Sequence, residues 1–123
     1  MSLEKIQSVV EVYIDSMKEA SAEKVKEAFH PNGSVVGHLH GDFLEMSTDD
    51  FAGFVSSQEP SDVEFEILST EIHGTTASVK VRDKYLGITF LDTLSLIEID
   101  NEWSIYSLPV SYTHLTLPTT DRV

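Results

Sequence analysis

One strand-like segment, residues 88–96, constrains the fold of this chain more than any other feature. The two-residue period of a β-strand puts the carboxylate of Asp92 on the same face as four apolar side chains, those of Ile88, Phe90, Leu94 and Leu96. Because burying an unpaired charge is costly, we expect Asp92 to be hydrogen-bonded, paired, protonated or exposed to a wet pocket. The segment therefore predicts a polar group inside a core or at the wall of a pocket.

Length and composition favour one acidic domain without a polyanionic partner. The 123 residues are 41% apolar, which suffices for one ordinary core. The formal net charge of −13 would repel phosphate backbones and anionic lipids, so we expect no nucleic-acid and no membrane binding. The chain has no cysteine, which excludes thiolate chemistry and favours a cytoplasmic protein. It has no P-loop, nucleotide-binding glycine motif or nucleophile elbow, and we expect no cofactor.

The N-terminal half predicts three helices and a hairpin. A first helix over roughly residues 3–20 follows from apolar side chains at helical spacing, namely Ile6, Val9, Val10, Tyr13, Ile14 and Met17. Ser21 is a favourable N-cap for a second, short helix, which the turn-forming segment Pro31–Gly33 should end. Residues 34–40 predict a strand, with a short hairpin partner at 42–46. A third helix should begin within residues 47–50, with its apolar stripe formed by Phe51, Phe54 and Val55.

Three long strand patterns follow, over about residues 62–73, 75–87 and 88–100. In the first two, apolar and polar side chains alternate, which predicts a buried face formed by Val63, Phe65, Ile67, Ala77, Val79 and Val81. A turn at residues 100–102 leads to a final strand, Trp103–Leu108. The pattern as a whole predicts a single α+β domain over residues 1–108.

Residues 109–123 form a segment of a different kind. The stretch Pro109–Thr120 carries no charge, is rich in threonine and continues no earlier pattern. It also resembles a peptide found at the ends of translated sequencing reads in which adapter DNA has been read as protein. We therefore hypothesise that residues 109–123 are a non-domain tail and a sequencing-adapter artefact, with the true C-terminus missing near Leu108. A continuous genomic reading frame through Thr120 would contradict this hypothesis.

Three short motifs give the chain a family resemblance: Val9–Tyr13, Ala28–Gly33 and Glu102–Ile105. Together with the order of helices and strands, they resemble the nuclear transport factor 2-like (NTF2-like) superfamily, which includes SnoaL-like and ketosteroid-isomerase-like proteins, over about residues 3–108. Within it, the chain is most similar to the branch labelled putative lumazine-binding. The resemblance implies a cone in which a curved antiparallel sheet wraps round three N-terminal helices, with an apolar pocket and dimerisation through the sheet.

Ketosteroid isomerase, a member of this superfamily, implies candidate catalytic residues. Tyr13 falls where that enzyme has its oxyanion-hole tyrosine, and Asp92 falls where it has an aspartate kept protonated by an apolar site. The enzyme also has a general base at the end of the first strand, where this chain has Gly37 with His38 beside it. His38 would serve as the base only if a bulge or a one-residue change of register turned it inward.

Each candidate also has a structural interpretation. The ring of Tyr13 could pack in the core while its hydroxyl finds one partner. Asp92 could form an ion pair with Lys84 or Arg82, or accept a hydrogen bond from Tyr13. These alternatives stay open at the level of the sequence.

His38 and His40 lie two residues apart on a predicted strand and share a face. With Asp42 or Glu45 they could hold a metal ion. Solvent-exposed histidines are the commoner outcome on strands, so we expect no metal site.

The aromatic side chains predict a ligand pocket. The expected ligand-binding residues are Tyr13, Phe29, Phe51, Phe54, Tyr85, Phe90, Asp92 and Trp103. We expect a homodimer that binds a small apolar or aromatic molecule. One alternative is an isomerase, dehydratase or cyclase that uses Tyr13, Asp92 and His38. Another is that the aromatic residues fill the cone and the domain is a sheet-mediated interaction module.

Overall fold

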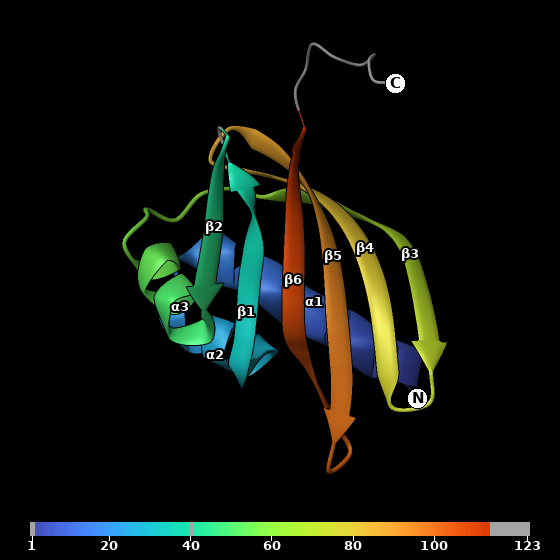
Figure 1. Cartoon of the computed structure of the whole chain (residues 1–123). Helices are drawn as coiled ribbons and strands as arrows, with labels where there is room; N and C mark the ends of the chain where they lie inside the picture. The colour runs from blue at the N-terminus through green and yellow to red at the C-terminus, as the bar shows by residue number, and fades with distance from the viewer. Residues whose placement is uncertain (1, 40, 114–123) are drawn as a thin grey trace, which may run out of the picture.

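The computed structural model describes residues 2–39 and 41–113. Within them, three helices lie against one face of a six-stranded curved sheet (Figure 1). The helices are α1 Ser2–Glu19, α2 Ala22–Ala28 and α3 Thr48–Ser56. The strands are β1 Phe29–Leu39, β2 Asp42–Ser47, β3 Glu64–His73, β4 Thr76–Tyr85, β5 Ile88–Ile99 and β6 Glu102–Thr113. The predicted α+β cone is confirmed.

The strand order is β2-β1-β6-β5-β4-β3. Neighbouring strands are antiparallel except for β1 and β6, which are parallel. The first and last strands are therefore neighbours inside the sheet, second and third from the β2 edge. The resemblance implied an antiparallel sheet, and this one parallel pair departs from it.

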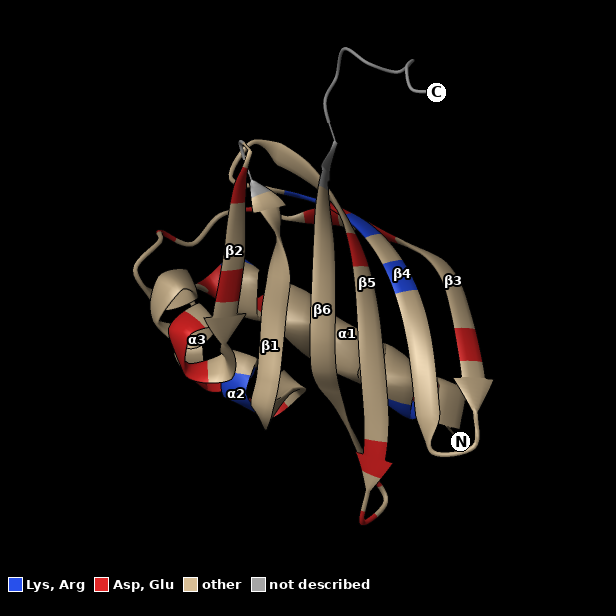
Figure 2. Ribbon diagram, viewed as in Figure 1, with Lys and Arg blue, Asp and Glu red and all other residues tan. Residues whose placement is uncertain are grey.

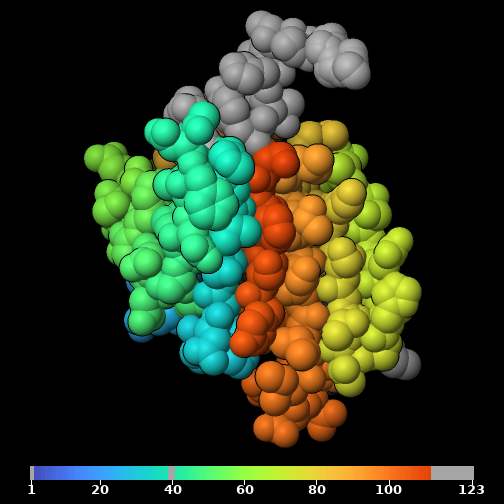
Figure 3. Space-filling view, in the orientation of Figure 1, coloured from blue at the N-terminus to red at the C-terminus, as the bar shows by residue number. Residues whose placement is uncertain are grey.

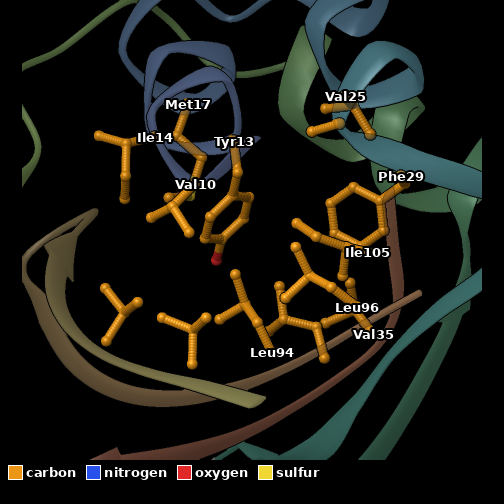
Figure 4. Close-up of a cluster of buried hydrophobic side chains, with 14 of the residues drawn as sticks. Val10, Tyr13, Ile14, Met17, Val25, Phe29, Val35, Leu94, Leu96 and Ile105 are labelled. Atoms are coloured by element: carbon orange, nitrogen blue, oxygen red, sulfur yellow. The ribbon is translucent and has the colours of Figure 1, made fainter. Parts of the chain in front are cut away.

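Helix α1 crosses the inner face of the sheet and supplies one side of the core (Figure 1). Its buried residues recur at a spacing of three or four, so one side of the helix meets the sheet. Figure 4 shows Val10 and Tyr13 projecting from α1 towards the sheet, where Leu94 and Leu96 lie. The first helix is confirmed close to its predicted bounds.

Capping side chains mark the starts of the two short helices. Ser21 precedes α2, and its side chain accepts a hydrogen bond of 3.1 Å from the backbone N–H of Lys24. Ser47 precedes α3 and forms a capping box with Asp50, in which each side chain accepts from the other residue's backbone N–H. Both predicted helix starts are confirmed.

The segment Pro31–Gly33 is not the separate turn that the sequence predicted. Strand β1 begins at Phe29, directly after α2, and its register against β6 shifts before Ser34. The segment is thus an irregular stretch within β1. The hydroxyl of Thr48, at the start of α3, donates to the carbonyls of His30 and Gly33 at 2.7 and 3.2 Å. Because α3 satisfies these carbonyls, the chain passes through the segment without leaving the strand.

The strand β3 lies at the edge of the sheet, and this position changes the burial predicted from its alternation. Phe65 pairs with Asp83 and shares its inner face, as expected. It is nevertheless exposed, because an edge strand has a neighbour on one side only.

The strand β6 continues past the predicted end at Leu108. Pro109 and Val110 pair with Val36 and Gly37 of β1. Residues 109–113 are therefore part of the sheet, which corrects the predicted end of the last strand. The rest of the proposed tail, residues 114–123, lies outside the described residues, and the origin of the segment stays a prediction.

The outer face of the sheet forms a continuous surface from β1 to β3 (Figure 3). Acidic residues outnumber basic ones, 21 to 8, and Figure 2 shows them on α3, β2, β3 and β5. Among the described residues, no helix is long and apolar enough to cross a lipid bilayer.

Candidate functional site

A cavity of about 220 Å³ opens between α1, α3 and the inner face of the sheet. Its walls are largely apolar and include Met17, Val35, Met46, Phe51, Phe90 and Val110. Leu44, Phe54 and Leu86 also line it and are partly exposed to solvent, so they form its rim. The cone is therefore not filled by its aromatic side chains.

Tyr13 and Asp92 meet at the polar end of this cavity. The hydroxyl of Tyr13 in α1 donates a hydrogen bond of 2.8 Å to Oδ2 of Asp92 in β5. Both side chains are almost completely buried, at 3% and 1% exposure. Burial, followed by the negative charge of Asp92, raises the pKa of Tyr13 well above its usual value, so the hydroxyl stays protonated as a donor. Of the alternatives for Asp92, the hydrogen bond to Tyr13 is the one that the structure contains.

The ion pair between Asp92 and Lys84 or Arg82 does not form. Strand alternation puts these two cations on the outer face, where both are exposed. Arg82 instead hydrogen-bonds to Glu66 on the neighbouring strand. This alternative is excluded for a simple geometric reason: residues 82 and 84 lie on the opposite side of the sheet from Asp92.

Asp83 is a second buried carboxyl in the site, and sequence reasoning missed it. It is 2% exposed, lines the cavity and lies within hydrogen-bond reach of Asp92. Burial is the main cause that raises the pKa of Asp83 to about 10, with the hydrogen bond to Asp92 and its charge adding to the shift. Burial also raises the pKa of Asp92, whereas hydrogen bonds from Asp83 and Tyr13 lower it. Burial of the two neighbouring carboxyls therefore favours one shared proton over two negative charges at neutral pH.

A signal for Asp83 was present in the sequence. The buried positions of β4 alternate as Ala77, Val79 and Val81, and the same period continues to Asp83 and Tyr85. Within the part of the chain that the structure describes, the buried hydroxyl of Tyr85 has no hydrogen-bond partner, and burial raises the pKa of this residue. An apolar cavity thus ends at two carboxyls and two phenol groups.

The end of β1 offers no carboxylate and no inward-facing base. Gly37 pairs with Leu44 and Val110, two residues that line the cavity, so Gly37 takes the inner face. A Cβ atom at Gly37 would lie 2.4 Å from the carbonyl oxygen of Val110, which leaves no room for a side chain. His38 also borders the cavity, but it is exposed and its ring packs against Phe43 at 5.4 Å. The inward turn that His38 would need as a base is not present.

Six of the predicted ligand-binding residues line the cavity: Tyr13, Phe51, Phe54, Tyr85, Phe90 and Asp92. Phe29 and Trp103 do not line it and are buried in the core. Phe29 packs edge-on against Tyr13 at a centroid distance of 5.9 Å, so it supports the wall from behind. Strand alternation could not separate wall from core, because both kinds of residue face inward.

The metal site considered for His38 and His40 lies partly outside the described residues. No group of three or more His, Cys, Asp or Glu side chains suited to a metal ion occurs among the described residues. His40, the second histidine of the pair, lies outside them.

The curved sheet, its inner helices and the apolar cavity define the chain as a cone of the NTF2-like class. A solved NTF2-like protein of unknown function from Silicibacter pomeroyi DSS-3 superposes with a TM-score of 0.87 and 24% identity, covering 91% of this chain and 96% of that one. An NTF2-like protein of unknown function from Methylobacillus flagellatus KT gives a TM-score of 0.86 and 22% identity, covering 92% of this chain and 93% of the other. At these identities the likeness establishes the fold alone.

The chain belongs to the family described as putative lumazine-binding, whose model matches residues 1–108. The family predicted from its motifs is thereby confirmed. A curated relative, the aldolase FrzH of Cladobotryum sp, is 30% identical over 98 residues, which cover 77% of this chain and 78% of that protein.

Proposed function

We propose that this protein binds a small, mainly apolar or aromatic molecule in the cone cavity. The observation that carries the proposal is the apolar cavity that ends at a buried cluster of polar groups, Tyr13, Asp83, Tyr85 and Asp92. The hydroxyl of Tyr85 is buried and has no hydrogen-bond partner among the described residues, which favours a ligand that supplies one. Pockets for drug-sized ligands are typically about 300–1,000 Å³, so the ligand of this smaller cavity is small as well.

The name of the family agrees with this proposal, since lumazine is a small, flat heterocycle. Lumazine itself is therefore a suitable first probe. Its intrinsic fluorescence should change on titration with the protein, and native mass spectrometry should detect any small molecule that is retained after purification.

A matched pair of variants tests whether binding occurs in this cavity. Leu44→Trp enlarges a side chain at the rim and should weaken binding by blocking entry. Leu68→Trp makes the same change on β3, where the residue is exposed and outside the cavity lining, and should leave binding unaltered. Absence of both a retained molecule and lumazine binding would contradict the proposal.

A second candidate function is an enzyme that acts on a carbonyl compound, as an isomerase, dehydratase, cyclase or aldolase. The relative named as an aldolase favours it, as do the two carboxyls and Tyr13 at the end of the cavity. In this reading, Tyr13 stabilises the developing oxyanion, and the Asp83–Asp92 pair rather than His38 moves the proton. Loss of activity in Asp92→Asn, with activity retained in His38→Ala, would support this assignment.

We also propose that the protein is a homodimer in the cytoplasm. The outer face of the sheet is the candidate interface, because it is broad (Figure 3). Tyr106 of β6 belongs to this face, since it is exposed and alternates with the buried Ile105. Tyr106→Glu should shift the mass measured by light scattering from dimer to monomer, and an unchanged mass would argue against this interface. A cysteine-free chain suits a reducing compartment, and cell fractionation tests that location.

A further inference from the structure

We infer that the Asp83–Asp92 pair recognises a cationic nitrogen, so that the ligand is a small aromatic or apolar molecule bearing a protonated amine, amidine or heterocycle. This inference rests on the proposed function and specifies its ligand class. It follows from the position of the pair, from its charge and from the groups that surround it.

The two carboxyls are diagonal neighbours on one hairpin. Strands β4 and β5 pair so that Val81 lies opposite Asp92 and Asp83 lies opposite Phe90. Diagonal positions on the same face of an antiparallel pair lie within reach of each other's side chains. Both residues line the cavity, so a ligand at its end lies beside both carboxyls.

The pair carries one negative charge at neutral pH. Two carboxyls in contact in an apolar site cannot both be ionised, and they share a proton instead. Among the described residues, Asp83 Oδ2 and Asp92 Oδ1 are buried carboxyl oxygens without a hydrogen-bond partner. A proton shared by the two carboxyls would supply the donor that they lack. The hydroxyl of Tyr13 donates to the remaining oxygen of Asp92 and stabilises the charge there.

Among the described residues that line the cavity, none is a lysine or arginine that would balance this charge. The other titratable groups that face the pair are the phenols of Tyr13 from α1 and Tyr85 from β4, which are neutral donors. His38 borders the cavity from β1 but is exposed, and the described lining contains no lysine or arginine. A buried charge without a counter-ion is costly, so a cationic ligand group gains more here than a neutral one.

The walls of the cavity suit the rest of such a ligand. Phe51 and Phe90 line it, and aromatic faces attract cations as well as flat apolar groups. An anionic ligand would instead meet the charge of the pair in a medium that screens it poorly.

Cation binding should release the shared proton to solvent. With a positive group against both carboxyls, ionisation of Asp83 becomes favourable, because an opposite charge lowers the pKa of an acid. An amidinium then donates one N–H group to each carboxylate. The ligand keeps all its bonds, and the only species lost from the complex is the proton of the pair.

Three probes of nearly the same shape test the inference: benzamidine, a cation; benzamide, which is neutral; and benzoate, an anion. Calorimetry at pH 7, in two buffers with different ionisation enthalpies, gives both the affinity and the number of protons released. Benzamidine should bind at least about tenfold more tightly than benzamide and release about one proton, and benzoate should not bind. Equal affinities for benzamidine and benzamide would overturn the inference.

Two variants separate the roles of the carboxyls. Asp83→Asn should keep the preference for benzamidine, because the charge of Asp92 remains, but should release no proton. Asp62→Asn removes one charge from an exposed loop and should behave like the wild type. Proton release that persists in Asp83→Asn would contradict the inference. If that variant does not fold, the three probes on the wild-type protein still decide the charge preference.

The same experiments distinguish this inference from the proposed function. Binding of lumazine or benzamide without preference for benzamidine would leave the cavity a ligand site and remove its cation specificity. Failure of every probe, together with the absence of a retained molecule, would contradict both.

Discussion

The hydroxyl of Tyr13 donates to Oδ2 of Asp92 over 2.8 Å and joins two buried side chains that are 79 residues apart in the chain. The bond links helix α1 to strand β5 across the end of the cavity. The bond gives Asp92, a carboxylate within an apolar strand face, a hydrogen-bond donor. It also uses the hydroxyl proton of Tyr13 that an oxyanion hole would need. The arrangement therefore favours a site that holds a negative charge over one that stabilises a substrate's negative charge.

Removal of the Tyr13 hydroxyl should destabilise the fold. In Tyr13→Phe, the charged oxygen of Asp92 loses a buried donor, which typically costs about 1–3 kcal/mol. Urea denaturation at pH 7 measures the loss. Tyr106→Phe is the control, because that hydroxyl belongs to an exposed residue and its removal should change the free energy of unfolding by less than about 0.5 kcal/mol. Equal effects of the two substitutions would show that the bond to Asp92 contributes nothing.

Stability should fall as the pH rises from about 4 to about 10. Burial raises the pKa of Asp83 to about 10 in the folded protein, whereas in the unfolded chain this carboxyl ionises near its ordinary pKa of 3.8. Between these values, the native state holds a proton that the unfolded state lacks, so higher pH favours unfolding. The slope is at most about 1.4 kcal/mol per pH unit for one proton.

Asp83→Asn removes that linked proton and tests the origin of the slope. The difference in unfolding free energy between wild type and Asp83→Asn should therefore vary with pH between 5 and 9, in the direction of a relatively less stable wild type at high pH. Urea midpoints at several pH values measure it. Parallel curves for the two proteins would mean that Asp83 is ionised in the folded state.

The turn between β4 and β5 should become more stable when Leu86 is replaced by Asn. Leu86 has a φ of 55° and precedes Gly87 with a φ of 78°, a conformation that Asn-Gly adopts far more readily than Leu-Gly. Relief of this strain should stabilise the protein by about 1 kcal/mol. Ligand binding should weaken at the same time, because the side chain of Leu86 forms part of the cavity rim.

Asn101→Gly provides the matched change at a turn outside the cavity lining. Asn101 has a φ of 67° in the turn between β5 and β6. A small gain in stability without a change in ligand affinity is expected there. If Leu86→Asn also left the affinity unaltered, the rim would have no part in binding.

Gly37→Ala should destabilise the protein by about 1–3 kcal/mol, the usual cost of overpacking. The added Cβ would lie 2.4 Å from the carbonyl oxygen of Val110, and a backbone atom of a central strand cannot easily move. Gly53→Ala is the contrasting change in α3, where a Cβ meets nothing within 4 Å and the better helix propensity should add about 0.5–1 kcal/mol. Thermal melting of the two variants should shift in opposite directions. A neutral Gly37→Ala would mean that β1 and β6 do not pair as described.

Much of the fold could be predicted because its signals are local. The apolar stripe of α1, the caps Ser21 and Ser47 and the alternation of β4 and β5 each act within a few residues of sequence. The motifs at Val9–Tyr13 and Glu102–Ile105 added the family, and with it the cone.

The errors arose where a residue's environment depends on a distant strand. The segment Pro31–Gly33 has turn chemistry, but contacts from Thr48 keep it in β1. Phe65 alternates like a core residue, yet it lies on an edge strand and is exposed. The orientation of His38 also depended on register, because Gly37 and its neighbours Leu44 and Val110 take the inner face.

The sequence by itself determined that Asp92 lies among apolar side chains and that Tyr13 faces the core, because helix and strand periods assign each side chain to a face. Only the tertiary structure decided what surrounds Asp92. The pairing of β4 with β5 brings Asp83 to its side, and the crossing of α1 over the sheet brings the hydroxyl of Tyr13 to its oxygen. Proton sharing and charge depend on distances between atoms of different elements, and strand periodicity carries no information about those distances.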